Sequence, residues 1–173
     1  MNPAKEAIEE LVRHYGLSPL PVEGTLVRGT YQSAQKDSEG RSTVSTMMGL
    51  YCESPQSLSC FHRLDYDEVW HFYEGDPLEL HLLYPDGSTQ TVVMGRDRQK
   101  GQLCQFVIPA HVWQGGCIVP GGAYALFGCT VAPAFTPSCF EAGLCDELIK
   151  AYPDKEAVIR KLSVNGDVRR MPD

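Results

Sequence analysis

Between residues 23 and 131 the chain alternates short apolar runs with polar turns, and no helical spacing interrupts this pattern. Alternation of apolar and polar positions over a short run is typical of half-buried strands. Strands are predicted over residues 25–32, 43–51, 78–84, 89–94, 103–108, 112–119 and 124–131, with another pair around residue 66. A succession of short strands joined by turns favours an antiparallel sandwich or barrel.

The two ends of the chain show a different pattern. Ile8, Leu11, Val12 and Tyr15 recur at helical spacing, which predicts a helix over residues 3–15 with Asn2 as its cap. Prolines at 133 and 137 end the strand pattern. Beyond them, helices are predicted over residues 138–150 and 153–162, followed by a loose tail.

A length of 173 residues suits one domain with a core of its own. We divide the predicted domain into an N-terminal helix and linker over residues 1–22, a β-barrel over 23–135, and a C-terminal helical segment and tail over 136–173.

The stretch from Phe61 to Gly75 is predicted to form a strand, a tight acidic turn and a second strand. Side chains alternate between the two faces of a strand, so Glu68, Trp70 and Phe72 share one face. His62 and Leu64 share a face of the preceding strand. If the turn folds the chain back, a base, a carboxylate and an indole meet over one apolar cavity. A hydrogen-bonded core histidine at position 62 is the alternative interpretation.

This stretch resembles the first motif of the cupin superfamily, which runs His-x-His, three or four residues, Glu, six residues and Gly. His62, Glu68 and Gly75 match it, whereas Leu64 stands where the second histidine is expected. The wider phrase is similar to the small stand-alone cupins of the cupin-5 type, a largely uncharacterised subfamily. The resemblance implies an all-β jelly-roll barrel (a double-stranded β-helix) with flanking helices, and it implies a homodimer.

The second cupin motif resembles the segment from Pro109 to Gln114. His111 stands where the motif has glycine, and Gln114 stands where it has a metal-binding histidine. A typical cupin offers three histidines and one glutamate to a metal. Leucine cannot ligate and glutamine is a weak ligand, so we expect no metal cofactor. If a divalent ion does bind, its ligands would be His62, Glu68 and Gln114.

We therefore expect a cupin that binds a small molecule in a pocket built around His62 and Glu68. These two residues are the candidate catalytic pair for acid–base chemistry. The candidate ligand-binding residues are Thr46, Leu64, Trp70, Phe72, Gln105, Trp113, Gln114 and Thr130. A metal-independent sugar or sugar-nucleotide epimerase or isomerase is one alternative, and a metal-dependent oxygenase or lyase is another. Whether the protein is an enzyme stays open.

The net charge and the cysteine pattern limit which binding partners and which cellular compartment are expected. The formal net charge of −7 disfavours nucleic acid and anionic membrane surfaces, which bind clustered Lys and Arg. No apolar run is long enough to span a membrane. The seven cysteines include no Cys-x-x-Cys pair, which disfavours zinc fingers and redox dithiols. Free thiols in a reducing, cytoplasmic compartment are expected.

Overall fold

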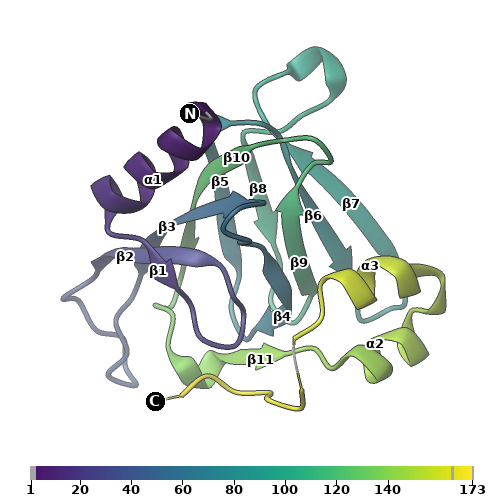
Figure 1. Ribbon diagram of the computed structural model, residues 1–173. Coiled ribbons are helices and arrows are strands. Elements are labelled where there is room, and N and C mark those ends of the chain that lie inside the picture. The colour runs from purple at the N-terminus through teal and green to yellow at the C-terminus, as the bar shows by residue number, and fades with distance from the viewer. Residues whose placement is uncertain (1–2, 165, 173) are drawn as a thin grey trace.

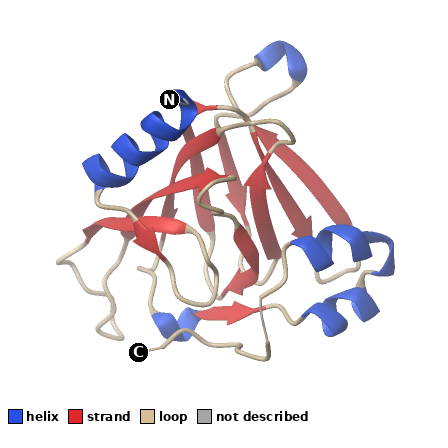
Figure 2. Cartoon of the chain, viewed as in Figure 1, coloured by secondary structure: helices blue, strands red, loops and turns tan. Residues whose placement is uncertain are grey.

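The computed structural model describes residues 3–164 and 166–172, so the predicted cap at Asn2 lies outside the described residues. Two antiparallel sheets face each other (Figures 1 and 2). The six-stranded sheet has the order β1 (Ser18–Pro19), β2 (Leu26–Gln32), β3 (Ser45–Cys52), β10 (Tyr124–Val131), β5 (Glu68–Gly75) and β8 (Gln105–Ile108). The five-stranded sheet has the order β11 (Phe140–Ala142), β4 (Ser59–Leu64), β9 (Trp113–Ile118), β6 (Leu78–Leu83) and β7 (Thr89–Met94).

Helices cover both sheets from outside. Helix α1 (Pro3–Tyr15) packs Ile8 against Leu50 and Leu126 of the six-stranded sheet. Helices α2 (Cys145–Ala151) and α3 (Glu156–Lys161) lie beside the five-stranded sheet, as Figure 2 shows. Short 3₁₀ turns are η1 (Arg98–Lys100), η2 (Pro137–Cys139) and η3 (Pro153–Lys155). No helix in the described part of the chain is long and apolar enough to cross a membrane.

One part of the space between the sheets is filled by a hydrophobic core. Trp70 and Phe127 stack with ring centroids 4.5 Å apart, and Tyr51 packs against Phe127 at 4.6 Å. Gly49 lies directly opposite Phe127 on the neighbouring strand, and a Cβ at this position would run into the phenylalanine ring. The glycine therefore allows the aromatic stack to lie flat against the sheet.

The all-β jelly-roll prediction is confirmed, and several boundaries agree closely. The predicted helix 3–15 and the predicted strands 89–94 and 124–131 match the observed elements. The hydrogen bonding does not close into a barrel, because the described strands form two separate sheets.

Two sequence predictions need correction. Strands β4 and β5 do not pair with each other; the acidic turn between them carries the chain from one sheet to the other. Residues 138–144 are not α-helical: the segment ends the 3₁₀ turn η2 and then pairs as β11 with the edge strand β4. A three-residue strand has too few positions for its alternation to be recognised in the sequence.

Candidate functional site

A cavity of about 490 Å³ lies between the sheets beside the aromatic core. Its size suits a small organic ligand. Strands β2, β3, β4, β5 and β10 contribute to its wall, together with the linker before β2 and the segment that includes β11. The lining residues are Leu20, Glu23, Val27, Gly29, Thr30, Tyr31, Gln32, Ser45, Thr46, Met47, His62, Leu64, Glu68, Cys129, Val131, Phe135 and Phe140.

His62 is held in one orientation on the five-stranded sheet. Its Nδ1 lies 2.8 Å from the carbonyl oxygen of Cys60, and its ring stacks on Phe140 at 5.2 Å. A carbonyl only accepts, so Nδ1 donates and Nε2 bears the lone pair in the neutral ring. Every fully buried polar side-chain atom of the described residues has a partner. Nε2 makes no hydrogen bond and is therefore open to the cavity.

Glu68 faces His62 from the opposite sheet. Its Oε2 accepts a hydrogen bond of 3.1 Å from Trp70 Nε1, and the side chains of Gln114 and Cys129 lie beside the carboxyl group. Burial raises the pKa of Glu68 above its ordinary value of 4.5, although the charge of His62 opposes this rise. The carboxyl group is thus biased toward holding a proton in a site that also contains a base.

Glu23 is a second cavity carboxylate, which the sequence analysis did not single out. It is only 6% exposed and lies in the turn before β2. The hydroxyl of Thr25 donates to Glu23 Oε1, and a chain of buried hydroxyls continues through Ser59 to Tyr51. The charge of Glu23 adds to the rise in the pKa of Glu68. The cavity therefore has two acids and one imidazole.

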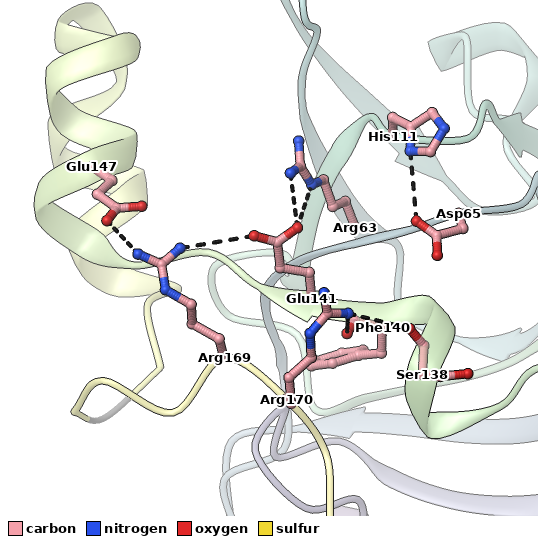
Figure 3. A network of polar contacts seen from close by, with 9 residues as sticks. All are labelled: Arg63, Asp65, His111, Ser138, Phe140, Glu141, Glu147, Arg169 and Arg170. Carbon is pink, nitrogen blue, oxygen red and sulfur yellow. Dashed lines mark hydrogen bonds and ion pairs between the residues drawn. The ribbon is translucent and has the colours of Figure 1, made fainter.

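The C-terminal segment fixes the wall on which His62 stacks (Figure 3). Arg170 Nη1 donates to the carbonyl of Phe140 at 2.8 Å and to that of Ser138 at 3.2 Å. Glu141, the residue after Phe140, forms an ion pair of 2.7 Å with Arg63. These contacts hold β11 beside β4, which sets the position of the phenylalanine ring against the imidazole.

The structure brings some of the predicted ligand-binding residues to the cavity. Thr46 and Leu64 line it together with His62 and Glu68. Trp70 and Gln114 lie behind its wall, where the indole Nε1 bridges Glu68 and the Oε1 of Gln114. Phe72 is buried in the aromatic core. Their roles toward a ligand stay predictions.

Besides Trp70, Gln114 and Phe72, three further predicted residues do not line the cavity. Gln105 is exposed beside His71, and Trp113 lies on the outer face, with Arg63 over its ring at 4.5 Å. Cys129 and Val131 contribute the lining from β10, so Thr130 between them faces the other side of the sheet. The parity of β10 cannot be read from its sequence, because Leu126 on its outer face is also buried, beneath α1.

The donors inside the cavity do not fit the metal site of a typical cupin. Leu64 offers no ligand atom, and Gln114 Oε1 is bonded to Trp70. His111 does not compensate, because its side chain is 60% exposed and lies 3.7 Å from Asp65. Its φ of 67° keeps the left-handed backbone for which the motif has glycine. His62 and Glu68 alone are too few ligands to hold a divalent ion tightly.

Comparison with known proteins agrees with this architecture. A structure from Shewanella oneidensis is 31% identical, with a TM-score of 0.84, and the match covers 91% of this chain and 98% of that one. A hypothetical protein from Leishmania major is 28% identical, with a TM-score of 0.82 and the same coverage. A cupin 2 domain-containing protein from Halorhodospira halophila shares the fold at 14% identity and a TM-score of 0.54, covering 83% of this chain and 86% of its own. No curated protein matches the chain.

A jelly-roll of two antiparallel sheets around an internal cavity defines the protein as a cupin in architecture. Residues 9–143 match the Cupin_5 family, described as cupin superfamily (DUF985), and the chain belongs to this family. The resemblance inferred from the sequence motifs is thereby confirmed.

Proposed function

We propose that the protein binds a neutral or positively charged small molecule in the cavity built around His62 and Glu68. The supporting observation is the charge of the lining: it includes the carboxyl groups of Glu23 and Glu68, and none of the described lining residues is Lys or Arg. Buried acids attract cations and accept hydrogen bonds from hydroxyl or amino groups.

The same lining disfavours anionic ligands. Phosphates and carboxylates are usually recognised by Arg or Lys, often through paired hydrogen bonds. A sugar nucleotide would bring a diphosphate close to Glu23 and Glu68 without a compensating cation. A free sugar, a polyol or a small amine suits the cavity better, and Phe135 and Phe140 offer flat apolar surfaces to such a ligand.

A metal-independent epimerase or isomerase acting on a free sugar is the second candidate. It is favoured by the fixed tautomer of His62, whose Nε2 faces the cavity as a base. Glu68, with its raised pKa, is suited to supply a proton to the same ligand. In this scheme His62 removes a proton from a carbon next to a carbonyl group, and Glu68 protonates the oxygen on which charge develops.

We also propose that two copies associate through the outer face of the six-stranded sheet, in a reducing cytoplasmic compartment. Tyr73, Leu103 and Val107 are each more than 40% exposed on or beside β5 and β8. Exposed apolar groups of this kind are typical of interaction surfaces. All seven cysteines are free, in keeping with a reducing compartment.

Binding is tested by thermal shift and calorimetry with free sugars, polyols, amines, carboxylates and sugar nucleotides. We expect a neutral or amine compound to raise the melting temperature, and the rise to be lost in His62→Ala and in Glu68→Gln. His71→Ala is the matched control, because His71 lies on the outer side of β5 beside Gln105 and does not line the cavity.

Failure of every compound to stabilise the protein would remove the binding proposal. Preferential stabilisation by sugar nucleotides or carboxylates would overturn the charge argument. For the second candidate, NMR of a bound sugar in heavy water reports exchange of the proton next to the carbonyl group. Binding without exchange leaves a binding protein and removes the epimerase.

A further inference from the structure

Three side chains that commonly ligate metals gather on the outer face of the five-stranded sheet, away from the cavity. Glu79 and His81 are two residues apart on β6 and share a face, while Cys117 lies directly opposite Glu79 on β9. The inward face of β6 instead carries Leu80 and Leu82, which belong to the aromatic core. The carboxylate oxygen, the imidazole nitrogen and the thiol sulfur all lie within 4.8 Å of one another.

The imidazole of this group is already oriented by a neighbouring strand. Nδ1 of His81 lies 3.3 Å from the hydroxyl of Thr91 on β7, and Nε2 lies 3.4 Å from Glu79 Oε2. A partner on the remote ring nitrogen is the arrangement that usually holds a metal-ligating histidine in place. The free end of the ring points toward the carboxylate, and the side chain of His81 is only 15% exposed.

A lysine supplies a positive charge beside this group. Lys161, the last residue of α3, places Nζ 3.4 Å from the sulfur of Cys117. Lys161 is exposed and its four-carbon side chain is flexible, so the ammonium group can move into solvent. A divalent cation would take over the same role with higher charge and with direct bonds.

We propose that Glu79, His81 and Cys117 bind a zinc-type divalent cation and leave a fourth position open. Sulfur, imidazole nitrogen and carboxylate oxygen together are a donor set that selects zinc over magnesium or calcium. Bond lengths of about 2.0–2.3 Å to zinc require the three donors to come within roughly 4 Å of one another. Small side-chain rotations are enough to reach that geometry from the observed one. Among the described residues, this is the group whose donor atoms lie close enough.

The site is tested by titrating reduced, metal-free protein with cobalt(II), whose bond to a thiolate gives a near-ultraviolet charge-transfer absorption. We expect saturation at one equivalent, displacement of cobalt by zinc, and loss of the absorption in Cys117→Ala. His81→Ala should weaken the affinity by at least about tenfold, since even outer partners of a ligand contribute that much. Cys104→Ser is the matched control, because Cys104 is exposed and lies beside β5 of the six-stranded sheet, whereas the proposed ligands are on the five-stranded sheet.

Absorption that survives Cys117→Ala, or that disappears in Cys104→Ser, would overturn the proposal in favour of a surface thiol. Loss of binding in His62→Ala but not in His81→Ala would place the metal in the cavity and also overturn it. A test on the unmodified protein does not depend on how the variants fold. Cys117 is only 4% exposed and should be alkylated slowly; zinc should slow its alkylation further and leave that of the exposed Cys104 unchanged. Equal rates with and without zinc would contradict the site.

Discussion

Two clusters of the same residue types lie on opposite sides of the five-stranded sheet. The inner cluster combines His62 with Glu68 and Cys129, and the outer cluster combines His81 with Glu79 and Cys117. In the inner cluster the imidazole and the carboxyl group face each other across the cavity from different sheets. In the outer cluster all three donors come from adjacent strands of one sheet and lie within 4.8 Å.

The difference shows that surroundings, rather than residue type, decide the chemistry. Burial raises the pKa of Glu68 and raises that of the Cys129 thiol well above its ordinary value, so the inner cluster favours protonated groups and proton transfer. In the outer cluster burial also raises the pKa of the Cys117 thiol above its ordinary value, but Lys161 opposes this rise, and the inner cluster has no such cation among the described lining residues. A nearby cation favours the thiolate, which is the form that a metal binds.

The largest expected difference between the two sides concerns their tryptophans. Trp70→Ala should lower the free energy of unfolding by about 3–5 kcal/mol, because it leaves a cavity in the core and removes the indole donor from Glu68. Trp113→Ala on the outer face should cost less, about 1–2 kcal/mol, because the indole is only partly buried against the cluster under α2 and α3 and lies beneath Arg63. Urea unfolding followed by far-ultraviolet circular dichroism measures both. Equal losses would mean that the interior is no better packed than the outer surface.

The two clusters also differ in how far the sequence alone could predict them. The strands around His62 and Glu68 were predictable because alternation over several residues is a local property. The sequence analysis also expected His62 and Glu68 to face each other, and they do. The reason differs, because the turn carries the chain from one sheet to the other and does not form a hairpin. Glu23 was not predictable as a cavity residue, because it lies in a turn whose position depends on distant contacts: its carbonyl accepts from Cys60 N, and its partner Thr25 bonds to Leu58 and Ser59.

The outer cluster could not be predicted from the local sequence pattern either. Glu79 and Cys117 are neighbours only because β6 and β9 pair in one particular register. A register shift of one residue would turn Cys117 away from Glu79, and nothing in either strand alone specifies the pairing. The division of the chain into helix, barrel and C-terminal segment within one domain stays a prediction.

The next prediction concerns the buried hydroxyl chain beside the cavity. Thr25→Val should lower the free energy of unfolding by about 1–3 kcal/mol, because Glu23 then loses its hydroxyl donor while remaining buried. Thr30→Val is the control: its hydroxyl bonds to Thr46 at an exposed position, where water can replace the lost partner. A loss in the control as large as that in Thr25→Val would show that desolvation of Glu23 is unimportant.

A smaller loss is expected on the outer side of β4. Arg63 forms two hydrogen bonds to Glu141 Oε2 and lies over the ring of Trp113. Arg63→Lys keeps the charge but loses the planar contact, and should cost about 0.5–1 kcal/mol. Arg160→Lys, in the exposed pair with Glu156, should cost nothing measurable. Chemical denaturation of both variants at low and high salt measures these losses. If Arg63→Lys were as neutral as Arg160→Lys, the planar contact would contribute nothing to stability.

The smallest expected change has the opposite sign and depends on pH. Because the pKa of Glu68 is raised by burial, the folded protein holds this proton more tightly than the unfolded chain. The stability that this proton contributes is complete below the ordinary value of 4.5 and is lost as the pH rises through the higher folded-state value. Glu68→Gln cannot ionise, so its advantage over the natural protein should be small at pH 4 and larger at pH 8.

Comparing unfolding free energies of the two proteins at both pH values measures this effect, and Glu9→Gln on the exposed face of α1 controls for the change in net charge. An advantage of Glu68→Gln that is the same at both pH values would mean that the carboxyl group does not titrate differently on folding. A disadvantage that grows with pH would mean that the ionised form is preferred inside the cavity, with His62 as its partner. The first result would remove the argument that burial raises the pKa of Glu68. The second would reverse the proposed roles, with Glu68 accepting a proton from a bound ligand and His62 donating one.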